Sequence, residues 1–175
     1  MEIIYAVGTS PGIAIGPTYR QEQQRPKVSA KRIPEEMVGV ELAALDRALA
    51  GARSEITDLI AVAASKIGTK KAEIFQAQLM LLDDPEFIPP VREKIKTKKI
   101  NAAAALEQVI QKHSAVFAGI EDEYIRARIA DLHDVGSQII RQLNGSRPTK
   151  PRFEQPVIIF ADDLSPSETA LFDPA

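Results

Sequence analysis

The 175-residue sequence contains no cysteine and no tryptophan. The absence of cysteine excludes disulfide bonds, thiolate metal sites and a cysteine nucleophile. No apolar run approaches the length of about 20 residues that a helix needs to cross a bilayer. The opening residues, Met1 to Tyr5, lack the basic stretch and apolar core of a signal peptide. These absences predict a cytoplasmic protein without a membrane partner.

Aromatic residues and net charge are also scarce. Aromatic side chains make up 5% of the chain, and the formal net charge is −2. A balance this close to neutral gives no electrostatic case for nucleic acid as a partner. What is present is 45% hydrophobic residues, chiefly Ala, Ile, Leu and Val. This composition favours closely packed helices.

The first 32 residues read as a short β segment followed by a connector. Glu2 to Val7 and Ile13 to Tyr19 are rich in residues that favour strands, and Gly8 to Gly12 between them is a turn cluster. This arrangement predicts a β-hairpin. The polar stretch from Arg20 to Arg32 is expected to be a connector.

A long helix is predicted from Pro34 to the residue before Gly68. Pro34 suits the first helical position, and Gly68 suits a helix stop. Between them, apolar residues recur at alternating steps of mostly four and three, which predicts a seam that packs on other helices. The seam comprises Val38, Leu42, Leu45, Leu49, Ala52, Ile56, Leu59, Ala63 and Ile67.

Four further helical segments follow. The first two are expected over Lys70 to Leu82 and Glu86 to Lys98. Asn101 is placed to cap the third. A break at Gly119 to Asp122 separates it from the last helix, which should end at Asn144-Gly145.

The tail changes character. Gln155 to Ala161 reads as a strand, and Ser165 to Glu168 forms a capping box with Pro at the first helical position. The fold class predicted is therefore mainly α: a bundle of long helical hairpins over residues 33–146, inserted into an α/β domain. Residues 1–32 and 147–175 would be the two pieces of that domain, which would be truncated.

Four segments, in this order, resemble Enzyme I, the phosphoenolpyruvate–protein phosphotransferase of the bacterial sugar phosphotransferase system. They are Gly8 to Gly16, Glu73 to Pro85, Asp122 to Tyr124 with Arg128 and then Ala130 to Gly136, and Ala161 to Ala170. Together they extend over most of the chain. The resemblance identifies the sequence as the amino-terminal part of such an enzyme.

The resemblance implies a function and partners. Enzyme I takes a phosphoryl group from phosphoenolpyruvate onto a histidine and passes it to a histidine of the carrier protein HPr. The family has a helical subdomain that docks HPr and an α/β swivelling subdomain that carries the phosphohistidine. Its carboxy-terminal half requires Mg²⁺ and dimerises. The implied partner of this chain is an HPr-like carrier.

The catalytic histidine of the family lies in a Gly-Gly-Arg-Thr-Ser-His-Thr-type loop, which is absent from these residues. The histidines present, His113 and His133, lie on expected helix faces and are interpreted as ordinary helix residues. Asp131 and Asp134 flank His133 at metal-ligand spacing, but solvated acids are the commoner case. We expect no catalytic residue, no metal and no cofactor in this chain, and we expect it to be inactive by itself. Mg²⁺ is expected only for the full-length family.

The expected docking surface surrounds the end of the second helix. Leu79 to Leu82 are four consecutive apolar residues, and one helix cannot bury its whole circumference in its own core. Acidic side chains follow them, which suits a basic carrier. With the family positions included, the predicted partner-binding residues are Gln78, Met80, Leu81, Asp84, Glu86 and Arg128.

Two other readings stay open. The chain could be a non-catalytic paralogue that acts as a binding or regulatory module. It could also be a helical histidine phosphotransfer domain that uses His113 or His133.

Overall fold

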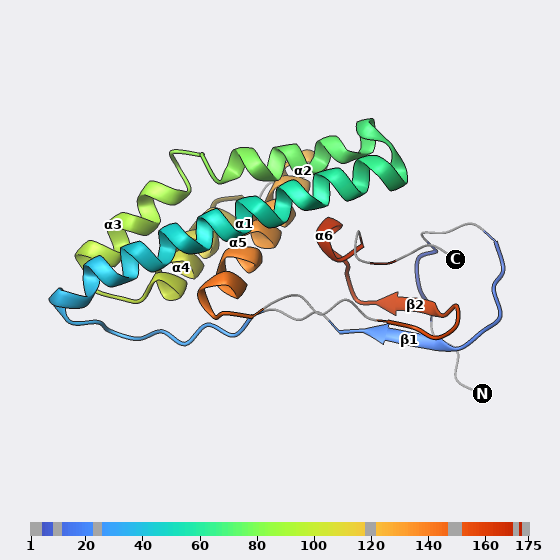
Figure 1. Ribbon diagram of the computed structural model, residues 1–175, viewed down its shortest axis with the longest axis horizontal. Coiled ribbons are helices and arrows are strands. Elements are labelled where there is room, and N and C mark those ends of the chain that lie inside the picture. The colour runs from blue at the N-terminus through green and yellow to red at the C-terminus, as the bar shows by residue number, and fades with distance from the viewer. Residues whose placement is uncertain are drawn as a thin grey trace.

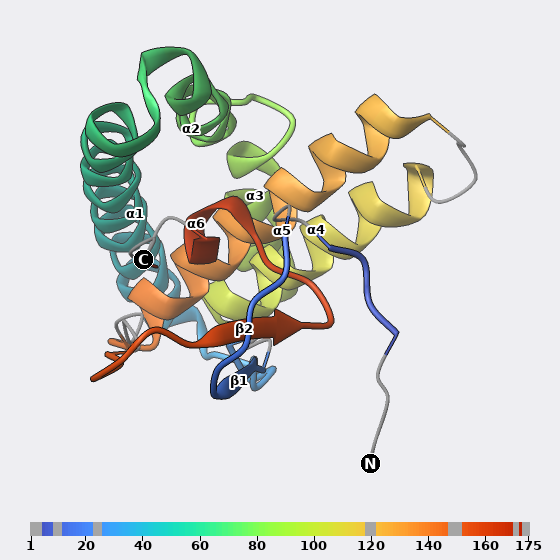
Figure 2. The same cartoon turned by 90° about the vertical axis from the view of Figure 1, so that its right-hand side faces the viewer.

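The computed structural model describes residues 5–8, 12–22, 26–117, 122–146, 152–169 and 172. Long helices form an elongated bundle, and a small parallel sheet lies at one end of it (Figure 1). A short helix, α6, lies between the sheet and the bundle (Figures 1 and 2). The protein is therefore mainly helical, as predicted. Within the described ranges, none of the helices combines the length and the apolar character that crossing a membrane requires.

The central element is α1, Val38–Ile67, which follows a single 3-10 turn over Glu35–Met37. At about 1.5 Å per residue its 30 residues extend over about 45 Å. It ends at Gly68, whose φ of 90° is a conformation that glycine adopts without a steric penalty. The predicted seam is confirmed: its described members are buried or packed against the core.

The other bundle helices pack around α1. They are α2, Thr69–Leu81, α3, Ile88–Lys98, α4, Ala102–Phe117, and α5, Glu123–Leu143. α1 contacts all of them, and α4 also packs on both α3 and α5. The sequence predicted a break at Gly119 to Asp122; of this stretch only Asp122 lies within the described residues, directly before α5.

The end of α5 confirms the predicted glycine stop. Gly145 has a φ of 66°. The Gly145 N–H donates to the Gln142 carbonyl at 3.1 Å, and the Ser146 N–H donates to the Arg141 carbonyl at 3.0 Å. This pair of bonds is a Schellman motif, which satisfies carbonyls that the helix end would leave unpaired.

Asn101 precedes α4 as predicted, but its side chain has a different role. Its Oδ1 accepts from the Lys31 N–H at 2.9 Å, and its Nδ2 donates to the Ser29 carbonyl at 3.2 Å. The first amide of α4, at Ala102, instead donates to Glu41 Oε2 of α1 at 2.8 Å. Asn101 thus fastens the connector before α1 to the bundle, and Glu41 fastens α4 to α1.

Two glycines allow helices to approach closely. A Cβ at Gly51 of α1 would lie 2.5 Å from Oε1 of Gln142 on α5. A Cβ at Gly136 of α5 would overlap the Cδ1 atom of Ile110 on α4. The flexible Gln142 side chain could move aside from a methyl at position 51, whereas the buried Ile110 has little room, so the close approach of α4 and α5 depends on Gly136.

The sheet corrects the hairpin prediction. Strand β1 is Thr18–Gln21, and it pairs in parallel with β2, Ile158–Ala161, with Thr18 opposite Ile158. Residues 5–8 and 12–17 form no strand, and 1–4 and 9–11 lie outside the described residues. A parallel pair needs a long crossover, which the whole bundle supplies here. The pairing joins a strand near the start of the chain to a strand near its end.

The segment after β2 forms as predicted. α6 is Pro166–Thr169. The Ser165 N–H donates to Glu168 Oε2 at 3.0 Å, and the Glu168 N–H donates to Ser165 Oγ at 3.2 Å. These reciprocal bonds are the capping box.

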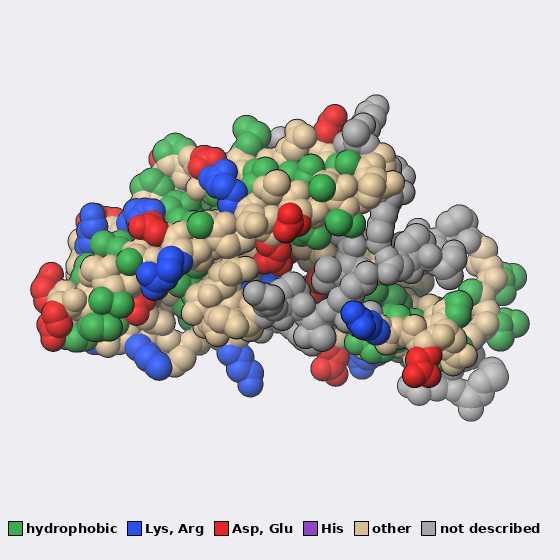
Figure 3. Space-filling view, viewed as in Figure 1, with side chains coloured by type: hydrophobic (Ala, Val, Ile, Leu, Met, Phe, Trp, Pro, Cys, Tyr) green, Lys and Arg blue, Asp and Glu red, His purple; other side chains and the backbone are tan. Residues whose placement is uncertain are grey.

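The segment before β1 exposes apolar side chains. Tyr5, Val7, Ile13 and Ile15 are all more than nine-tenths exposed. Figure 3 shows hydrophobic side chains at this end of the molecule, beside the sheet. In contrast, the buried apolar residues that the structure describes belong to the helices of the bundle and to the turn between α2 and α3.

Candidate partner-docking site

The site is built around the turn that joins α2 to α3. Asp84 organises this turn: its Oδ1 accepts from the Glu86 N–H at 2.8 Å, and its carbonyl accepts from the Phe87 N–H at 3.1 Å. Asp83 is held from the other side, because its Oδ1 lies 2.6 Å from Nη2 of Arg53 on α1. The turn is thus fixed by its own side chains and by α1.

A shallow groove opens beside this turn. It has a volume of about 370 Å³ and lies between the end of α2, the turn and α5. It is lined by Met80, Leu81, Asp83, Asp84, Pro85 and Arg128. We call it the α2–α5 groove. It combines an apolar floor with two carboxylates and one guanidinium.

The groove brings together four of the six residues that the sequence predicted to bind a partner. Met80 is 74% exposed, and Arg128 is exposed as well. Asp84 is half-buried. Leu81 lines the groove but is only 8% exposed, so most of its side chain belongs to the core. Glu86 is exposed on the turn but does not line the groove.

Gln78 requires a correction, since it is fully buried and has no surface to offer a partner in this structure. It lies three residues after Phe75 and four before Leu82, both buried, so it shares their inward face of α2. Its Nε2 donates to Asp134 Oδ2 of α5 at 3.0 Å. Gln78 therefore holds α2 to α5 beneath the groove.

A buried polar cluster, which the sequence reasoning missed, lies around Gln78. Asp134 Oδ2 accepts from Gln78 and, at 3.4 Å, from the Ser167 N–H of α6. Gln138 Nε2 donates to Ser167 Oγ at 2.9 Å. We call Gln78, Asp134, Gln138 and Ser167 the polar cluster. The sequence contains part of the information that predicts this cluster. Asp134 and Gln138 are four residues apart on α5, on the same side of the helix as the apolar Val135 and Ile139.

Asp131 links the polar cluster to the groove. Burial raises the pKa of its half-buried carboxyl above the ordinary value. A hydrogen bond from Gln78 opposes this, the nearby charge of Asp134 adds to it, and the charge of Arg128 opposes it. The pKa of Asp131 is thus influenced by one groove residue, Arg128, and by two members of the cluster, Gln78 and Asp134.

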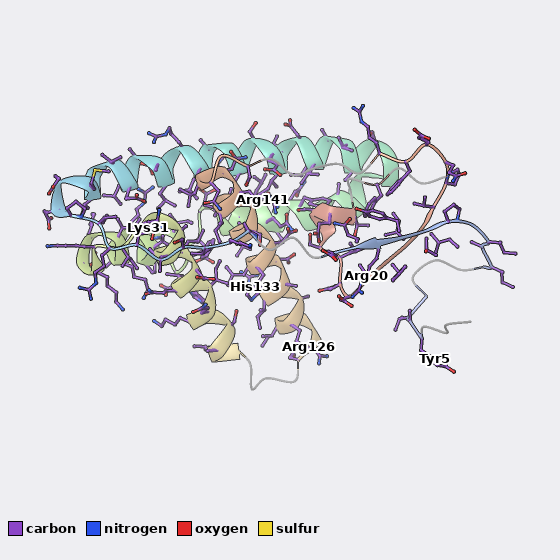
Figure 4. The ribbon with its side chains drawn as sticks, turned by 90° about the horizontal axis from the view of Figure 1, so that it is seen from below. Tyr5, Arg20, Lys31, Arg126, His133 and Arg141 are labelled. Carbon is purple, nitrogen blue, oxygen red and sulfur yellow. The ribbon has the colours of Figure 1, made fainter. Side chains whose placement is uncertain are left out.

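The two histidines serve the packing of neighbouring elements. His113 Nε2 lies 3.0 Å from the Glu86 carbonyl, and His133 Nε2 lies 2.9 Å from Ser114 Oγ on α4. Figure 4 shows His133 and Arg126 along α5, with Arg141 further along the same helix. Neither histidine lines the groove. Among the described residues no three His, Cys, Asp or Glu side chains form a group that could hold a metal ion.

Comparison with known proteins identifies the family. Residues 5–128 match the model of "PEP-utilising enzyme, N-terminal". The phosphoenolpyruvate-protein phosphotransferase of Geobacillus stearothermophilus is 37% identical over 168 residues, 95% of this chain and 29% of that protein. The Bacillus subtilis (strain 168) protein of the same name is 36% identical over 171 residues, 97% of this chain and 30% of that protein.

Solved structures show the same fold. An NMR solution structure of Enzyme I matches with a TM-score of 0.76 and 38% identity, covering 93% of this chain and 66% of that one. The N-terminal domain of "Enzyme 1 - Nitrogen" matches with a TM-score of 0.65 at 24% identity, which supports the fold alone. The chain spans about 30% of the length of the phosphotransferases it matches and belongs to the PEP-utilising enzyme N-terminal family, where it is similar to the N-terminal part of Enzyme I.

Proposed function

We propose that this chain is the N-terminal part of a phosphoenolpyruvate–protein phosphotransferase, and that its helical bundle docks an HPr-like phosphocarrier in the α2–α5 groove. The parent enzyme would move a phosphoryl group from phosphoenolpyruvate, through a histidine, to that carrier in sugar uptake. It would act in the cytoplasm, use Mg²⁺ and dimerise through its carboxy-terminal part. The family match and the names of the relatives support this assignment.

The groove is the observation that carries the docking proposal. Met80 exposes 74% of its surface at the end of a helix whose other large described apolar residues, Phe75, Leu79 and Leu81, are buried or half-buried. Methionine is flexible and polarisable, which suits a surface that must bind and release a partner. Asp83 and Asp84 add negative charge beside it. A carrier with basic residues around its histidine would be attracted to this rim, chiefly through its association rate.

The domain arrangement forms part of the proposal. Residues 33–146 would be the docking bundle, and residues 1–32 and 147–175 would be two pieces of one α/β swivelling domain. The parallel pairing of β1 with β2 supports this, because it joins the two pieces across the whole bundle. The exposed Tyr5, Val7, Ile13 and Ile15 also support it, since a larger sheet would cover such side chains.

The phosphoryl-bearing histidine is proposed to lie elsewhere in the parent enzyme. The family loop that carries it has no counterpart among these 175 residues. His113 and His133 each bond to a neighbouring element instead. The role proposed for this chain is therefore recognition of the carrier and not acceptance of the phosphoryl group.

Docking is tested by NMR titration of the labelled chain with an unphosphorylated HPr-like carrier. Shifts should concentrate on Met80, Asp84 and Arg128. Met80→Ala should weaken binding by roughly tenfold, in the range of a moderate interface hot spot. Met37→Ala is the matched control, because Met37 is also exposed, at 38%, but lies in the 3-10 turn before α1 and does not line the groove. It should leave the dissociation constant unchanged.

A second pair of variants tests the α5 side of the groove. Arg128→Ala should weaken binding several-fold, because its guanidinium can donate to carrier oxygens. Arg126→Ala, on the same helix but outside the groove lining, should not. Equal effects from both members of a pair, or shifts that avoid the groove at saturating carrier, would overturn the proposed docking site.

A further inference from the structure

α6 is attached to the bundle through the polar cluster, that is, by buried polar side chains and not by an apolar contact. Four polar residues are less than a tenth exposed in the described protein: Gln78, Asp134, Gln138 and Ser167. All four belong to this one contact, which joins α2 and α5 to α6. Figures 1 and 2 show α6 beside α5, between the bundle and the sheet. Polar burial is thus concentrated where the two parts of the fold meet.

The contact is only partly satisfied. Oε1 of Gln78 and Oε1 of Gln138 are buried and have no hydrogen-bond partner among the described atoms. A buried unpaired acceptor costs about 1–3 kcal/mol. Gln138 bonds α6 directly, so opening the contact would let water reach its Oε1 and recover that cost. The 23 buried residues of the main core cluster, in contrast, are all apolar.

α6 is short, and among its described residues the hydrogen bonds that join it to the bundle all involve Ser167. It is four residues long, and among its described side chains Ser167 is buried, Glu168 is half-buried and Thr169 is exposed. Both bonds from Ser167 end on α5, at Asp134 and Gln138. Its internal capping box involves only Ser165 and Glu168, so it requires no contact with the bundle.

We propose that Asp134, braced by Gln78 and joined by Gln138, positions the β2–α6 segment on the bundle as a latch that opens while the bundle stays folded. When the latch is closed, it fixes the placement of the β1–β2 sheet relative to the α2–α5 groove. Latch and groove share two helices: Gln78 and Met80 lie two residues apart on α2, and Asp134 follows Arg128 on α5. Asp134 is a positioning residue, and this inference does not depend on the identity of any docked partner.

Amide hydrogen exchange on the whole chain tests the latch. The readout in α6 is the amide of Ser167, which donates to Asp134 of the bundle, and the amide of Leu106 in α4 is the reference for the bundle. Asp134→Ala should speed α6 exchange by roughly tenfold, because it removes the acceptor for Ser167 and Gln78. The exchange rate of the Leu106 amide should change far less. Asp134→Asn keeps an oxygen acceptor and should restore most of the protection.

Two further variants separate the latch from general destabilisation. Ser167→Ala alters α6 alone and leaves every bundle residue in place, and it should also speed α6 exchange several-fold. Gln138→Leu should do the same, whereas Gln142→Leu should not. Gln142 is the matched control, one turn further along α5, where it bonds Glu55 of α1 and not α6.

The proposal is overturned in either of two cases. If Asp134→Ala speeds exchange at α6 and at Leu106 by the same factor, the cluster is an ordinary part of the folded core. If neither Asp134→Ala nor Ser167→Ala changes α6 exchange, the cluster does not hold the segment. Acceleration confined to α6, with recovery in Asp134→Asn, establishes the latch.

Discussion

The close approach of α4 and α5 depends on Gly136. Adding a methyl group there, in Gly136→Ala, should lower the stability of the protein, and the size of the loss should depend on the side chain at position 110. A Cβ at this position would overlap Ile110 Cδ1 and lie 3.3 Å from Ile110 Cγ1. Ile110 is only 5% exposed and belongs to the apolar core. Its end methyl therefore has little free space to move into.

The expected magnitude follows from two opposing terms. Overpacking a core with an added methyl group costs about 1–3 kcal/mol. Replacing glycine by alanine within a helix returns roughly 0.5–1 kcal/mol, through the smaller entropy of the unfolded chain. Gly136→Ala should thus destabilise the protein by up to about 2.5 kcal/mol. Ile110→Val alone should cost about 0.5–1.5 kcal/mol, because it removes one buried methyl group.

The double variant is the decisive measurement. Valine lacks Cδ1, so the new methyl at position 136 would occupy the space that Ile110→Val vacates. The double variant should be no less stable than Ile110→Val, which corresponds to a favourable coupling of about 1–3 kcal/mol. Urea unfolding followed by helical circular dichroism on all four proteins measures this coupling.

Gly39→Ala supplies the control. Gly39 also lies in a helix, but a Cβ there would meet nothing within 4 Å. It should be neutral or stabilising by up to about 1 kcal/mol, whatever residue is at 110. If Gly136→Ala and Ile110→Val prove additive to within about 0.5 kcal/mol, the two helices do not meet at Gly136 as described.

Two further predictions concern the charge at Asp131 and the apolar core. Because burial raises the folded-state pKa of Asp131, its contribution to stability is greatest below the unfolded pKa and is lost as pH rises through the folded pKa. Asp131→Asn should therefore be more stable than the parent chain at pH 7, with a difference that shrinks toward pH 3 in urea titrations; a difference independent of pH would contradict this. Ile56→Ala, at a fully buried position of α1, should cost about 2–5 kcal/mol by urea unfolding, and a loss below 1 kcal/mol would show that the α1 seam is not the core.

Much of the fold follows from patterns that repeat within a few residues. The alternating steps of three and four placed the buried face of α1, and Gly68 placed its end. Ser165 and Glu168 form the capping box that their spacing predicts. Such features depend on bonds and contacts between near neighbours in the chain, so a sequence read along its length contains them.

The docking groove was predictable only in part. The crowding of four apolar residues from Leu79 to Leu82 implied that one must be exposed, and the structure shows that this is Met80. The sequence could not show that Leu81 would be mostly buried or that Gln78 would be wholly buried. Which face of α2 is buried depends on the helices packed around it, and the local sequence does not specify those neighbours.

The sequence by itself determined the helices, their ends and the family resemblance, because these rest on local periodicity and on ordered motifs. Only the tertiary structure decided that β1 pairs in parallel with a strand some 140 residues later, at Thr18 and Ile158, in place of a hairpin. It alone gathered Gln78, Asp134 and Ser167 into one buried cluster, across sequence separations of 56 and 33 residues. The physical reason is that a strand edge or a buried amide must be satisfied by some partner, but which distant partner it meets depends on how all the helices pack together.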